Sequence, residues 1–372
     1  MSAPRPDAVV VGAGIVGAAC AEALAASGLS VEILEARFAG SGATGSAMGH
    51  LVVLDDSEAQ FALSALSRRL WTERAAELPP EVEDVAAGTL WVAADDEEMA
   101  HVRSKAGFYG ARGVETEILD GQALAEAEPN LRPGLAGALR VPGDRILYPP
   151  AAALWLLSRA EALGARVRVG EEVVHVGAGS VRTTSGRLDA GVVVVAAGER
   201  SPSLLPGLAI VPKRGHLVIT DRAPGFAHHQ LIELGYLRSA HGAARESVAF
   251  NLQPRATGQL LLGSSRELVG FDATLNRSLC GRMVRRALEY MPALGKLPAL
   301  RTWTGFRPAT PDNLPFIGGW PSVPGLFVAA GHEGLGITTS LGTARLVADL
   351  VTKRTPPIDP APFDPGRRLP NA

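Results

Sequence analysis

Three glycines near the start of the chain have the spacing of a phosphate-binding turn. Gly12, Gly14 and Gly17 follow the apolar residues 9–11 and open a segment of small apolar residues. Gly12 permits a tight exit from a strand, Gly14 lets a pyrophosphate approach the backbone, and Gly17 lets the next helix lie close to the strand. The free N–H groups and positive dipole end of that helix favour phosphate. The spacing therefore predicts a dinucleotide site.

An acidic residue completes this pattern. The second apolar run, residues 31–34, ends in Glu35, about 20 residues past the glycines. A carboxylate at this position can accept hydrogen bonds from ribose hydroxyls and disfavours a 2′-phosphate. An ordinary strand–helix–strand packing turn is the alternative reading of the glycines alone. The combination of strand, glycines, helix, second strand and acid favours the dinucleotide.

Composition limits the remaining classes of function. The 372 residues are 47% hydrophobic, which is enough for two domains of ordinary size. A net charge of −2 gives no basic field for nucleic acid. Cys20 and Cys280 have no metal-ligand spacing, so we expect neither a metal nor a disulfide framework. The first apolar run lacks a cleavage site and holds the phosphate glycines, which predicts a soluble, cytoplasmic protein without a membrane span.

The elements that must position these residues alternate along the chain. A Gly/Ser/Ala loop, residues 40–49, precedes the first long helix. Apolar periodicity predicts helices at 57–77, 97–112, 120–128, 149–163 and 277–291, and strands at 88–94, 166–169, 173–176 and 191–197. Short alternating strands between 215 and 265 indicate an antiparallel sheet. The segment 325–350 returns to strand, glycine turn and helix, and the Pro-rich residues 356–370 predict a loosely ordered tail.

Several segments together resemble a known family. The segments that carry this resemblance are the glycine turn, SGATGSAMGH (41–50), VVVAAGERSP, GFRPATPDNLPFIG (305–318) and LFVAAGHEGLGITTSLGTA (326–344). Through them, the chain resembles the FAD-dependent D-amino acid oxidase superfamily, in its glycine oxidase, sarcosine oxidase and D-amino acid dehydrogenase group. A closer similarity, to bacterial D-hydroxyproline dehydrogenases, is found in three segments: GHLVVLDDSEAQ, HHQLIELGYLRSAHG and LQPRATGQLLLGSSRE.

The resemblance implies an α/β fold with two domains. A discontinuous Rossmann-type FAD-binding domain would comprise residues 1–80, 145–212 and 303–355. An α+β substrate domain with a mainly antiparallel sheet would comprise 81–144 and 213–302, followed by the tail 356–372.

The resemblance also implies where FAD lies. The loop 41–47 would offer hydroxyls and N–H groups to the pyrophosphate and ribityl, although such composition also suits a surface loop. The backbone of Val174 would read adenine, and Arg37 either stacks on adenine or is solvated. The last helix, expected to begin near Thr338 or Thr339 as N-cap, would aim its positive end at the flavin. His332 either lines the flavin pocket or caps the turn.

The expected cofactor residues come from seven parts of the sequence. They are Gly12, Gly14, Ile15, Val16, Gly17, Glu35, Ala36, Arg37, Ser41, Thr44, Ala47, Met48, Gly49, Val174, Ala197, Gly198, Gly305, Arg307, His332, Glu333, Gly334, Leu335, Gly336, Ile337 and Thr338. No cysteine lies near Arg307, so we expect noncovalent FAD; a histidyl link elsewhere stays open.

Arg307 is the strongest candidate for binding substrate. In the family, the arginine of this segment grips the α-carboxylate and orients Cα–H towards flavin N5; a structural salt bridge is the alternative. Asn251 stands where glycine oxidases carry a tyrosine that helps bind the carboxylate. The polar candidates for the amine and ring of the substrate are His50, Glu233, Tyr236 and His241.

His50 follows the flavin loop and could accept the amine proton, or it could be a satisfied structural histidine. The other three could equally be solvated loop residues.

The resemblance implies FAD-dependent hydride transfer from the Cα of a small D-amino or imino acid, with cis-4-hydroxy-D-proline oxidised to 1-pyrroline-4-hydroxy-2-carboxylate. Glycine, sarcosine and D-proline are alternative substrates, and a noncatalytic flavin-binding subunit of a larger complex is an alternative class. An NAD-linked dehydrogenase is disfavoured because there is only one glycine turn. The electron acceptor (oxygen, quinone or protein) and homo-oligomerisation are left open.

Overall fold

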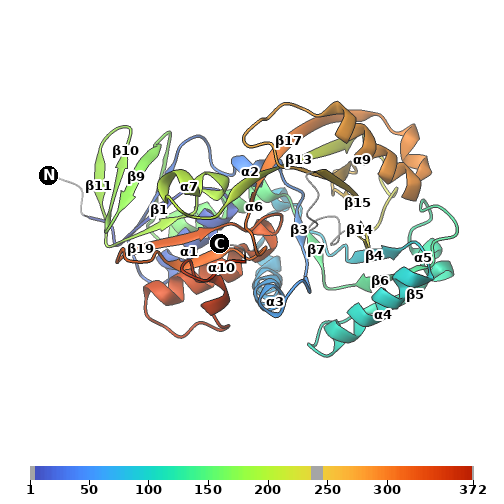
Figure 1. Cartoon of the computed structure of the whole chain (residues 1–372), viewed down its shortest axis with the longest axis horizontal. Coiled ribbons are helices and arrows are strands. Elements are labelled where there is room, and N and C mark those ends of the chain that lie inside the picture. The colour runs from blue at the N-terminus through green and yellow to red at the C-terminus, as the bar shows by residue number, and fades with distance from the viewer. Residues whose placement is uncertain (1–4, 236–245, 371–372) are drawn as a thin grey trace.

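The computed structural model describes residues 5–235 and 246–370, which contain two large sheets (Figure 1). The first, here called the parallel sheet, has the strand order β18-β19-β12-β1-β2-β8. Its strands pair in parallel except for β18, which runs antiparallel to β19. The strands are β1 (Ala8–Val11), β2 (Val31–Glu35), β8 (Arg166–Val169), β12 (Val192–Val195), β18 (Phe316–Gly319) and β19 (Leu326–Ala330).

A different layer covers each face of the parallel sheet. In β1, Ala8 and Val10 join the core formed with the helices, whereas Val9 and Val11 join the core formed with a small sheet, β11-β10-β9. All four side chains are buried, as expected for a strand covered on both sides. The layers consist of α1 (Ile15–Ala26), α6 (Pro149–Ala162) and α10 (Gly336–Val351) on one face, and β9 (Val173–Gly177), β10 (Ser180–Thr183) and β11 (Arg187–Asp189) with α7 (Ser201–Leu204) on the other.

The second sheet, here called the antiparallel sheet, has the order β17-β13-β16-β15-β14-β4-β6-β5. Only the β14–β4 pair is parallel within the described residues. Helices α9 and α4 pack on opposite faces and form separate cores. The elements are β4 (Thr89–Ala93), α4 (Asp96–Gly110), β5 (Glu117–Asp120), α5 (Gly121–Ala127), β6 (Gly137–Val141), β13 (Val211–Thr220), β14 (Gln230–Glu233), β15 (Glu246–Pro254), β16 (Leu260–Glu267), α9 (Arg277–Tyr290) and β17 (Ala299–Ala309).

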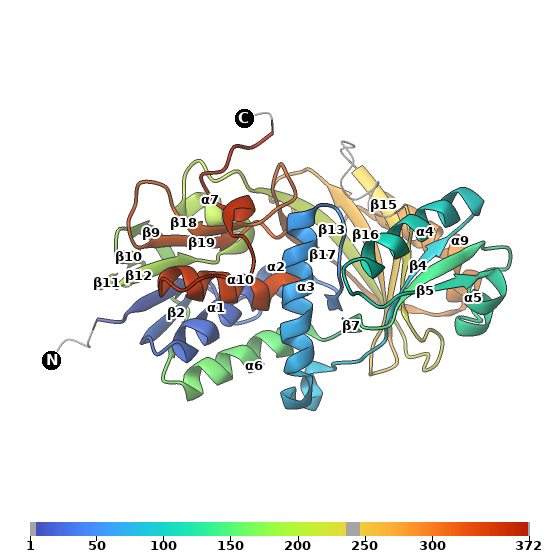
Figure 2. The same ribbon diagram turned by 90° about the horizontal axis from the view of Figure 1, so that it is seen from below.

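The chain crosses between the two sheets several times. The strands β3 (His50–Leu51) and β7 (Arg145–Ile146) pair with each other at the junction. Helix α3 (Glu58–Glu73) stands between the sheets and packs on α10 (Figure 2). Strand β17 belongs to the antiparallel sheet, so the domain boundary expected at residue 303 falls inside a strand. No helix in the described ranges combines the length and apolar character needed to cross a bilayer.

Some local predictions were wrong in detail. The loop expected at 40–49 contains the short helix α2 (Gly42–Ser46). Helix α3 ends at Glu73 and is followed by a separate 3₁₀ turn, Ala75–Glu77, rather than running to residue 77. Helix α10 begins at Gly336, two residues before the expected N-cap. The hydroxyl of Thr339 donates back to the Leu335 carbonyl within the first turn, so it does not cap the N–H groups.

The Pro-rich tail is docked, contrary to the expectation of loose order. Phe363 is fully buried in the core beside α10. The Arg367 guanidinium donates to both carboxylate oxygens of Asp312, at 2.7 and 2.9 Å, and to the Leu314 carbonyl at 2.8 Å. It also lies 4.1 Å from the ring centroid of Phe316. Proline content predicted flexibility, but these contacts hold the tail on β18 and the turn before it.

Replacing Arg367 by alanine should release this tail. Hydrogen bonds to a charged group each contribute about 1.5–3 kcal/mol, so we expect Arg367→Ala to lower the free energy of unfolding by roughly 2 kcal/mol. Urea denaturation measures this, and limited proteolysis should cut the variant within 356–370. Arg368→Ala changes the exposed neighbour and is the control. Equal stability of the two variants would contradict the assignment.

Candidate active site

The first glycine turn is shaped by backbone contacts. Gly12 has φ +106°, and a Cβ there would lie 2.6 Å from the Ala196 carbonyl oxygen. A Cβ at Gly17 would overlap the carbonyl oxygen of Gly12. These two positions therefore allow β1, β12 and α1 to meet closely. At Gly14 a Cβ would come within 4 Å of the Thr44 Oγ1 alone among described atoms, so this backbone is open to a ligand.

Side chains hold the start of α1 in place. Thr44 Oγ1, from α2, accepts a hydrogen bond from the Ile15 N–H at 3.0 Å. Glu35 Oε2 accepts from the Ala13 N–H at 2.8 Å, and its other oxygen accepts from the Arg37 N–H at 2.9 Å. The carboxylate is thereby fixed at the carboxyl end of β2, where it lines the cavity described next.

One continuous cavity of about 530 Å³ runs from this turn to the antiparallel sheet. Its volume lies in the range of small-molecule and cofactor sites. Most of the expected cofactor residues line it: Gly12, Gly14, Ile15, Val16, Glu35, Ala36, Arg37, Ser41, Thr44, Ala47, Met48, Ala197, Gly198, Gly305, Arg307, His332, Glu333, Gly334, Gly336 and Ile337. Residues from opposite ends of the sequence thus converge on one elongated site.

Five expected cofactor residues do not line the cavity. Gly17 and Gly49 serve close packing, since a Cβ at Gly49 would overlap the Leu147 carbonyl oxygen. Val173 lines the cavity, whereas the side chain of Val174 is 46% exposed. Thr338 donates to the His50 carbonyl oxygen at 2.7 Å, and Leu335 is the residue before α10.

Several lining residues were not predicted. Among them are Ser46, Glu171, Glu172, Glu199, Arg200, Ser203, Gly215, Leu217, Ser264 and Phe306. Those at 199–203 directly follow the VVVAAG strand end, whose position at the edge of the parallel sheet could have indicated them. Gly215, Leu217 and Ser264 come from antiparallel strands whose register decides which face they share, and the sequence carries no signal for that register.

His50 lines the cavity and carries a buried nitrogen, Nε2, without a hydrogen-bond partner in the described structure. Burial lowers the pKa of His50 to about 3, so the imidazole is neutral near pH 7. Buried nitrogens of this kind are rare without a ligand or water. The atom therefore fits a site that a cofactor or substrate completes.

His332 both lines the cavity and is tied to α10. Its Nε2 lies 3.0 Å from the hydroxyl oxygen of Thr343, two turns into the helix. Burial lowers the pKa of His332 to about 3. The residue thus lines the cavity, and its side chain contacts the middle of α10 instead of capping the turn.

Arg307 and Asn251 approach the cavity from the antiparallel sheet. The half-buried Arg307 side chain donates from Nη1 to the Ser265 carbonyl oxygen at 3.0 Å. Asn251 is buried, and its Oδ1 has no hydrogen-bond partner within the described ranges. Both residues line the cavity together with His50. A cationic, an amide and a neutral imidazole side chain thus belong to residues that border one space.

The remaining substrate candidates are not in this group. Glu233 lies outside the cavity: it accepts from the Phe250 N–H at 2.8 Å and from Arg286 Nε at 2.8 Å, and pairs with the Tyr290 hydroxyl at 3.2 Å. It is buried in β14 and anchors this strand to β15 and α9, so it is neither a cavity residue nor the solvated loop residue that was the alternative. Tyr236 and His241 lie outside the residues that the structure describes.

Comparison with known proteins identifies the family. Residues 7–350 match the family described as DAO, FAD dependent oxidoreductase. The chain belongs to the DAO family. This DAO-family chain is 31% identical to the glycine oxidase of Pseudomonas aeruginosa, over 97% of this chain and 99% of the relative. It is 30% identical to the D-amino acid dehydrogenase of Cereibacter sphaeroides, over 82% and 72%. The glycine oxidase structure from Geobacillus kaustophilus matches it with a TM-score of 0.89 at 29% identity, covering 99% and 100%.

Membership in the DAO family confirms the predicted fold class, the FAD cofactor and an oxidoreductase function. The residues present fit FAD. The open backbone at Gly14 and the start of α1 suit its pyrophosphate, and Glu35 suits its ribose. The start of α10 and the unsatisfied Nε2 of His50 lie farther along the same cavity, where the flavin ring would be held.

The two buried histidines predict how stability depends on pH. Their folded pKa values of about 3 lie below the ordinary value of 6.5, so between these limits only the unfolded chain binds the protons. Their contribution is complete above pH 6.5 and is lost as the pH falls. We expect each to remove up to about 2 kcal/mol of unfolding free energy between pH 7 and pH 5.

Urea denaturation at a fixed FAD concentration measures this dependence. His332→Gln should flatten it by close to one proton, whereas His101→Gln, at an exposed histidine on α4, should leave it unchanged. Identical pH dependence in all three proteins would refute the buried, neutral state of His332.

Proposed function

We propose that this enzyme oxidises a small D-amino or imino acid at its Cα–N bond, and that cis-4-hydroxy-D-proline, giving 1-pyrroline-4-hydroxy-2-carboxylate, is its substrate. The observation that carries the proposal is the convergence of Arg307, His50 and Asn251 on one cavity, together with the unpartnered polar atoms of His50 and Asn251 in the described structure. FAD, when bound, would supply the hydride acceptor for Cα. The protein groups then have three tasks: to hold the acid, the amine and the ring.

Arg307 is suited to the first task. A guanidinium offers paired N–H donors that match a carboxylate, and this geometry fixes the orientation of the acid as well as neutralising it. Gly334 leaves the region beside Arg307 uncrowded, since a Cβ there would be 3.7 Å from its Cδ and Nε. The cation thus reaches the space between the antiparallel sheet and the start of α10, where Cα–H would face the flavin.

His50 is suited to the second task. Hydride leaves an amine most readily when its nitrogen is uncharged, so a neutral hydrogen-bond acceptor that orients the uncharged amine is useful. Because burial keeps the pKa of His50 far below neutrality, its ring is unprotonated over the working pH range. It can therefore accept a hydrogen bond from the substrate nitrogen without carrying a competing positive charge.

Asn251 supports the ring hydroxyl. A buried amide oxygen without a protein partner in the described structure requires a donor from ligand or water. The hydroxyl of a hydroxyproline supplies such a donor, whereas glycine, sarcosine and proline have none on the carbon skeleton. The similarity of three sequence segments to D-hydroxyproline dehydrogenases supports the same substrate.

Glycine, sarcosine or D-proline is the second candidate class, favoured by the 31% identity to a glycine oxidase. Anaerobic loss of the flavin absorbance, measured with D- and L-prolines, hydroxyprolines, glycine and sarcosine, separates the two. The fastest bleaching by cis-4-hydroxy-D-proline supports the proposal. Faster bleaching by glycine or sarcosine selects the alternative, and no bleaching by any compound selects the noncatalytic subunit.

Loss of Arg307 should affect substrate binding. We expect Arg307→Ala to raise KM for the acid by roughly 10²-fold and Arg307→Lys by less, because lysine keeps the charge but not the paired donors. FAD content should remain complete. Arg301→Ala, an exposed arginine on the same strand, is the control for general damage to β17. An unchanged KM would remove Arg307 from the site.

Loss of His50 should affect turnover. An imidazole whose pKa is about 3 is too weak a base to take the ammonium proton, so the proton-acceptor role considered for His50 is not the one proposed. As a hydrogen-bond acceptor it would orient the uncharged amine, and we expect His50→Ala to lower kcat by roughly tenfold, the loss of one hydrogen bond. The pH profiles of both proteins should agree between pH 5 and 9, because His50 does not ionise there. An unchanged kcat in His50→Ala would remove His50 from the amine site.

A further inference from the structure

Arg307 reaches its position by crossing a strand. It lies on β17, yet its Nη1 donates at 3.0 Å to the Ser265 carbonyl oxygen on β16. Strand β13 separates these two strands in the sheet. The guanidinium passes over β13 at Gly215, where a Cβ would overlap Nη1 and lie 2.7 Å from Cζ. The missing side chain of Gly215 is therefore what gives Arg307 its path.

The strand that receives Arg307 has an irregular register. Arg214 pairs with Glu267, and Val218 pairs with Leu262, so β16 advances five residues where β13 advances four. An extra residue of this kind interrupts the ladder and can re-aim neighbouring groups. Ser265 lies within this bulge. Its carbonyl is thereby available to a side chain from the strand beyond β13.

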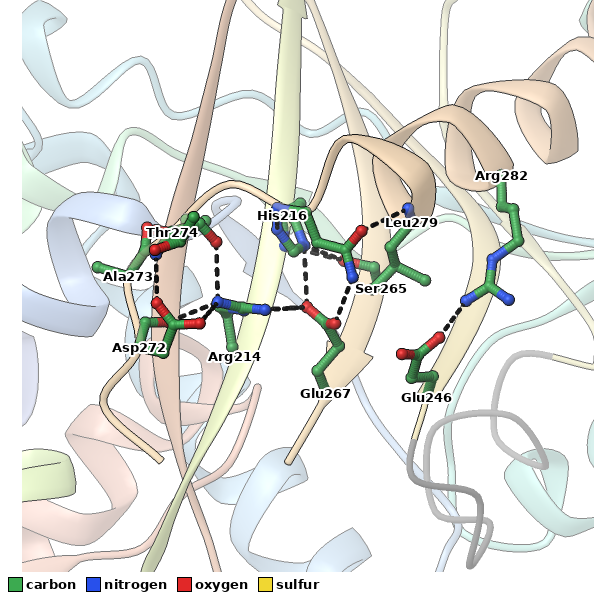
Figure 3. A network of polar contacts seen from close by, with 12 residues as sticks. Arg214, His216, Glu246, Ser265, Glu267, Asp272, Ala273, Thr274, Leu279 and Arg282 are labelled. Carbon is green, nitrogen blue, oxygen red and sulfur yellow. Dashed lines mark hydrogen bonds and ion pairs between the residues drawn. The ribbon is translucent and has the colours of Figure 1, made fainter. Parts of the chain in front are cut away.

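His216 fixes the other side of Ser265. The Ser265 hydroxyl oxygen accepts from the His216 backbone N–H at 3.0 Å and lies 2.8 Å from His216 Nδ1 (Figure 3). The backbone N–H of Asn276 donates to His216 Nε2 at 3.1 Å, so the neutral ring carries its proton on Nδ1. Burial lowers the pKa of His216, which agrees with this neutral tautomer. Both lone pairs of the hydroxyl are then used.

A charged network supports this arrangement. Arg214, almost fully buried, donates from Nε to Glu267 Oε2 at 2.9 Å and from Nη1 to the Thr274 carbonyl oxygen at 2.8 Å. Asn276 Nδ2 donates to the other oxygen of Glu267 at 2.7 Å. These contacts tie β13, β16 and the start of α9 together on the face of the sheet that Gly215 does not use.

We propose that Gly215, His216 and Ser265 are positioning residues that aim Arg307 into the cavity and so set the affinity for the substrate carboxylate. The inference rests on the proposed carboxylate-binding role of Arg307. None of the three residues needs to touch the acid. Gly215 provides the path, the Ser265 carbonyl holds one end of the guanidinium, and His216 prevents Ser265 from turning.

The test measures binding of two related probes to the FAD-loaded full chain. Pyrrole-2-carboxylate carries the ring and the acid but no oxidisable Cα–H, and pyrrole-2-carboxamide lacks only the charge. Their dissociation constants are obtained from the change each makes in the flavin spectrum. Gly215→Ala should weaken binding of the carboxylate by about 10²-fold, a loss in the range for disrupting a buried charge pair, and leave binding of the carboxamide nearly unchanged.

Matched controls separate positioning from damage. Gly319→Ala places a methyl where no atom lies within 4 Å, and should change neither constant. His216→Leu should weaken the carboxylate by up to roughly tenfold, the loss of one hydrogen bond. His216→Asn keeps a donor for Ser265 and should restore most of the affinity. Arg282→Met breaks a nearby exposed ion pair with Glu246 and should have no effect.

The outcomes distinguish the carboxylate-binding role of Arg307 from the positioning role of Gly215, His216 and Ser265. If Arg307→Lys leaves carboxylate affinity intact, the proposed function of Arg307 fails. If Arg307→Lys weakens it but Gly215→Ala and His216→Leu do not, or weaken both probes equally, the positioning role alone fails. Should Gly215→Ala not fold with FAD, Ser265→Ala replaces it, because it removes only the hydroxyl that His216 holds.

Discussion

The site depends on a few glycines, because other parts of the chain pack against them in the space that a Cβ would occupy. Gly12 allows the Ala196 carbonyl close to the first turn, and Gly17 allows α1 onto that turn. Gly305, on β17, leaves room for Ser46, since a Cβ added at Gly305 would lie 2.5 Å from the Ser46 Cβ. In the same way, Gly215 leaves room for Arg307. Three of these approaches, at Gly12, Gly215 and Gly305, bring together elements from distant parts of the chain. The cavity exists because these elements can meet at backbone distance.

Burial then decides the charge of the groups inside. His50 and His332 are neutral because taking an imidazolium out of water is unfavourable. The buried Arg214 guanidinium instead has Glu267, Asp272 and two carbonyl oxygens as hydrogen-bond partners. In the same low-dielectric interior, some polar residues are therefore neutral hydrogen-bond acceptors without a protein partner in the described structure, and others form ion pairs that connect strands.

The sequence predicted what depends on neighbours along the chain. The pattern of residues 8–35 specified β1, α1 and β2, and motif resemblance located Arg307, His50 and most of the cofactor cavity. The sequence did not predict features that depend on which strands pair when those strands lie far apart in the chain. The parallel β14–β4 pair, the bulge around Ser265 and the attachment of Glu233 to α9 arise from register between strands that lie far apart in sequence. Arg367 appeared to belong to a flexible tail because its partner, Asp312, is 55 residues away.

The strand order has a consequence for synthesis of the chain. Strand β1 lies between β2 and β12, so one of its edges is covered only after residue 192 has left the ribosome, and β19 and α10 come later still. At about 5–20 residues per second, the N–H and C=O groups of that edge stay unpaired for roughly 10–40 s. Exposed strand edges invite pairing with other chains. Nascent copies of this protein should therefore rely on chaperones until the second half of the parallel sheet has emerged.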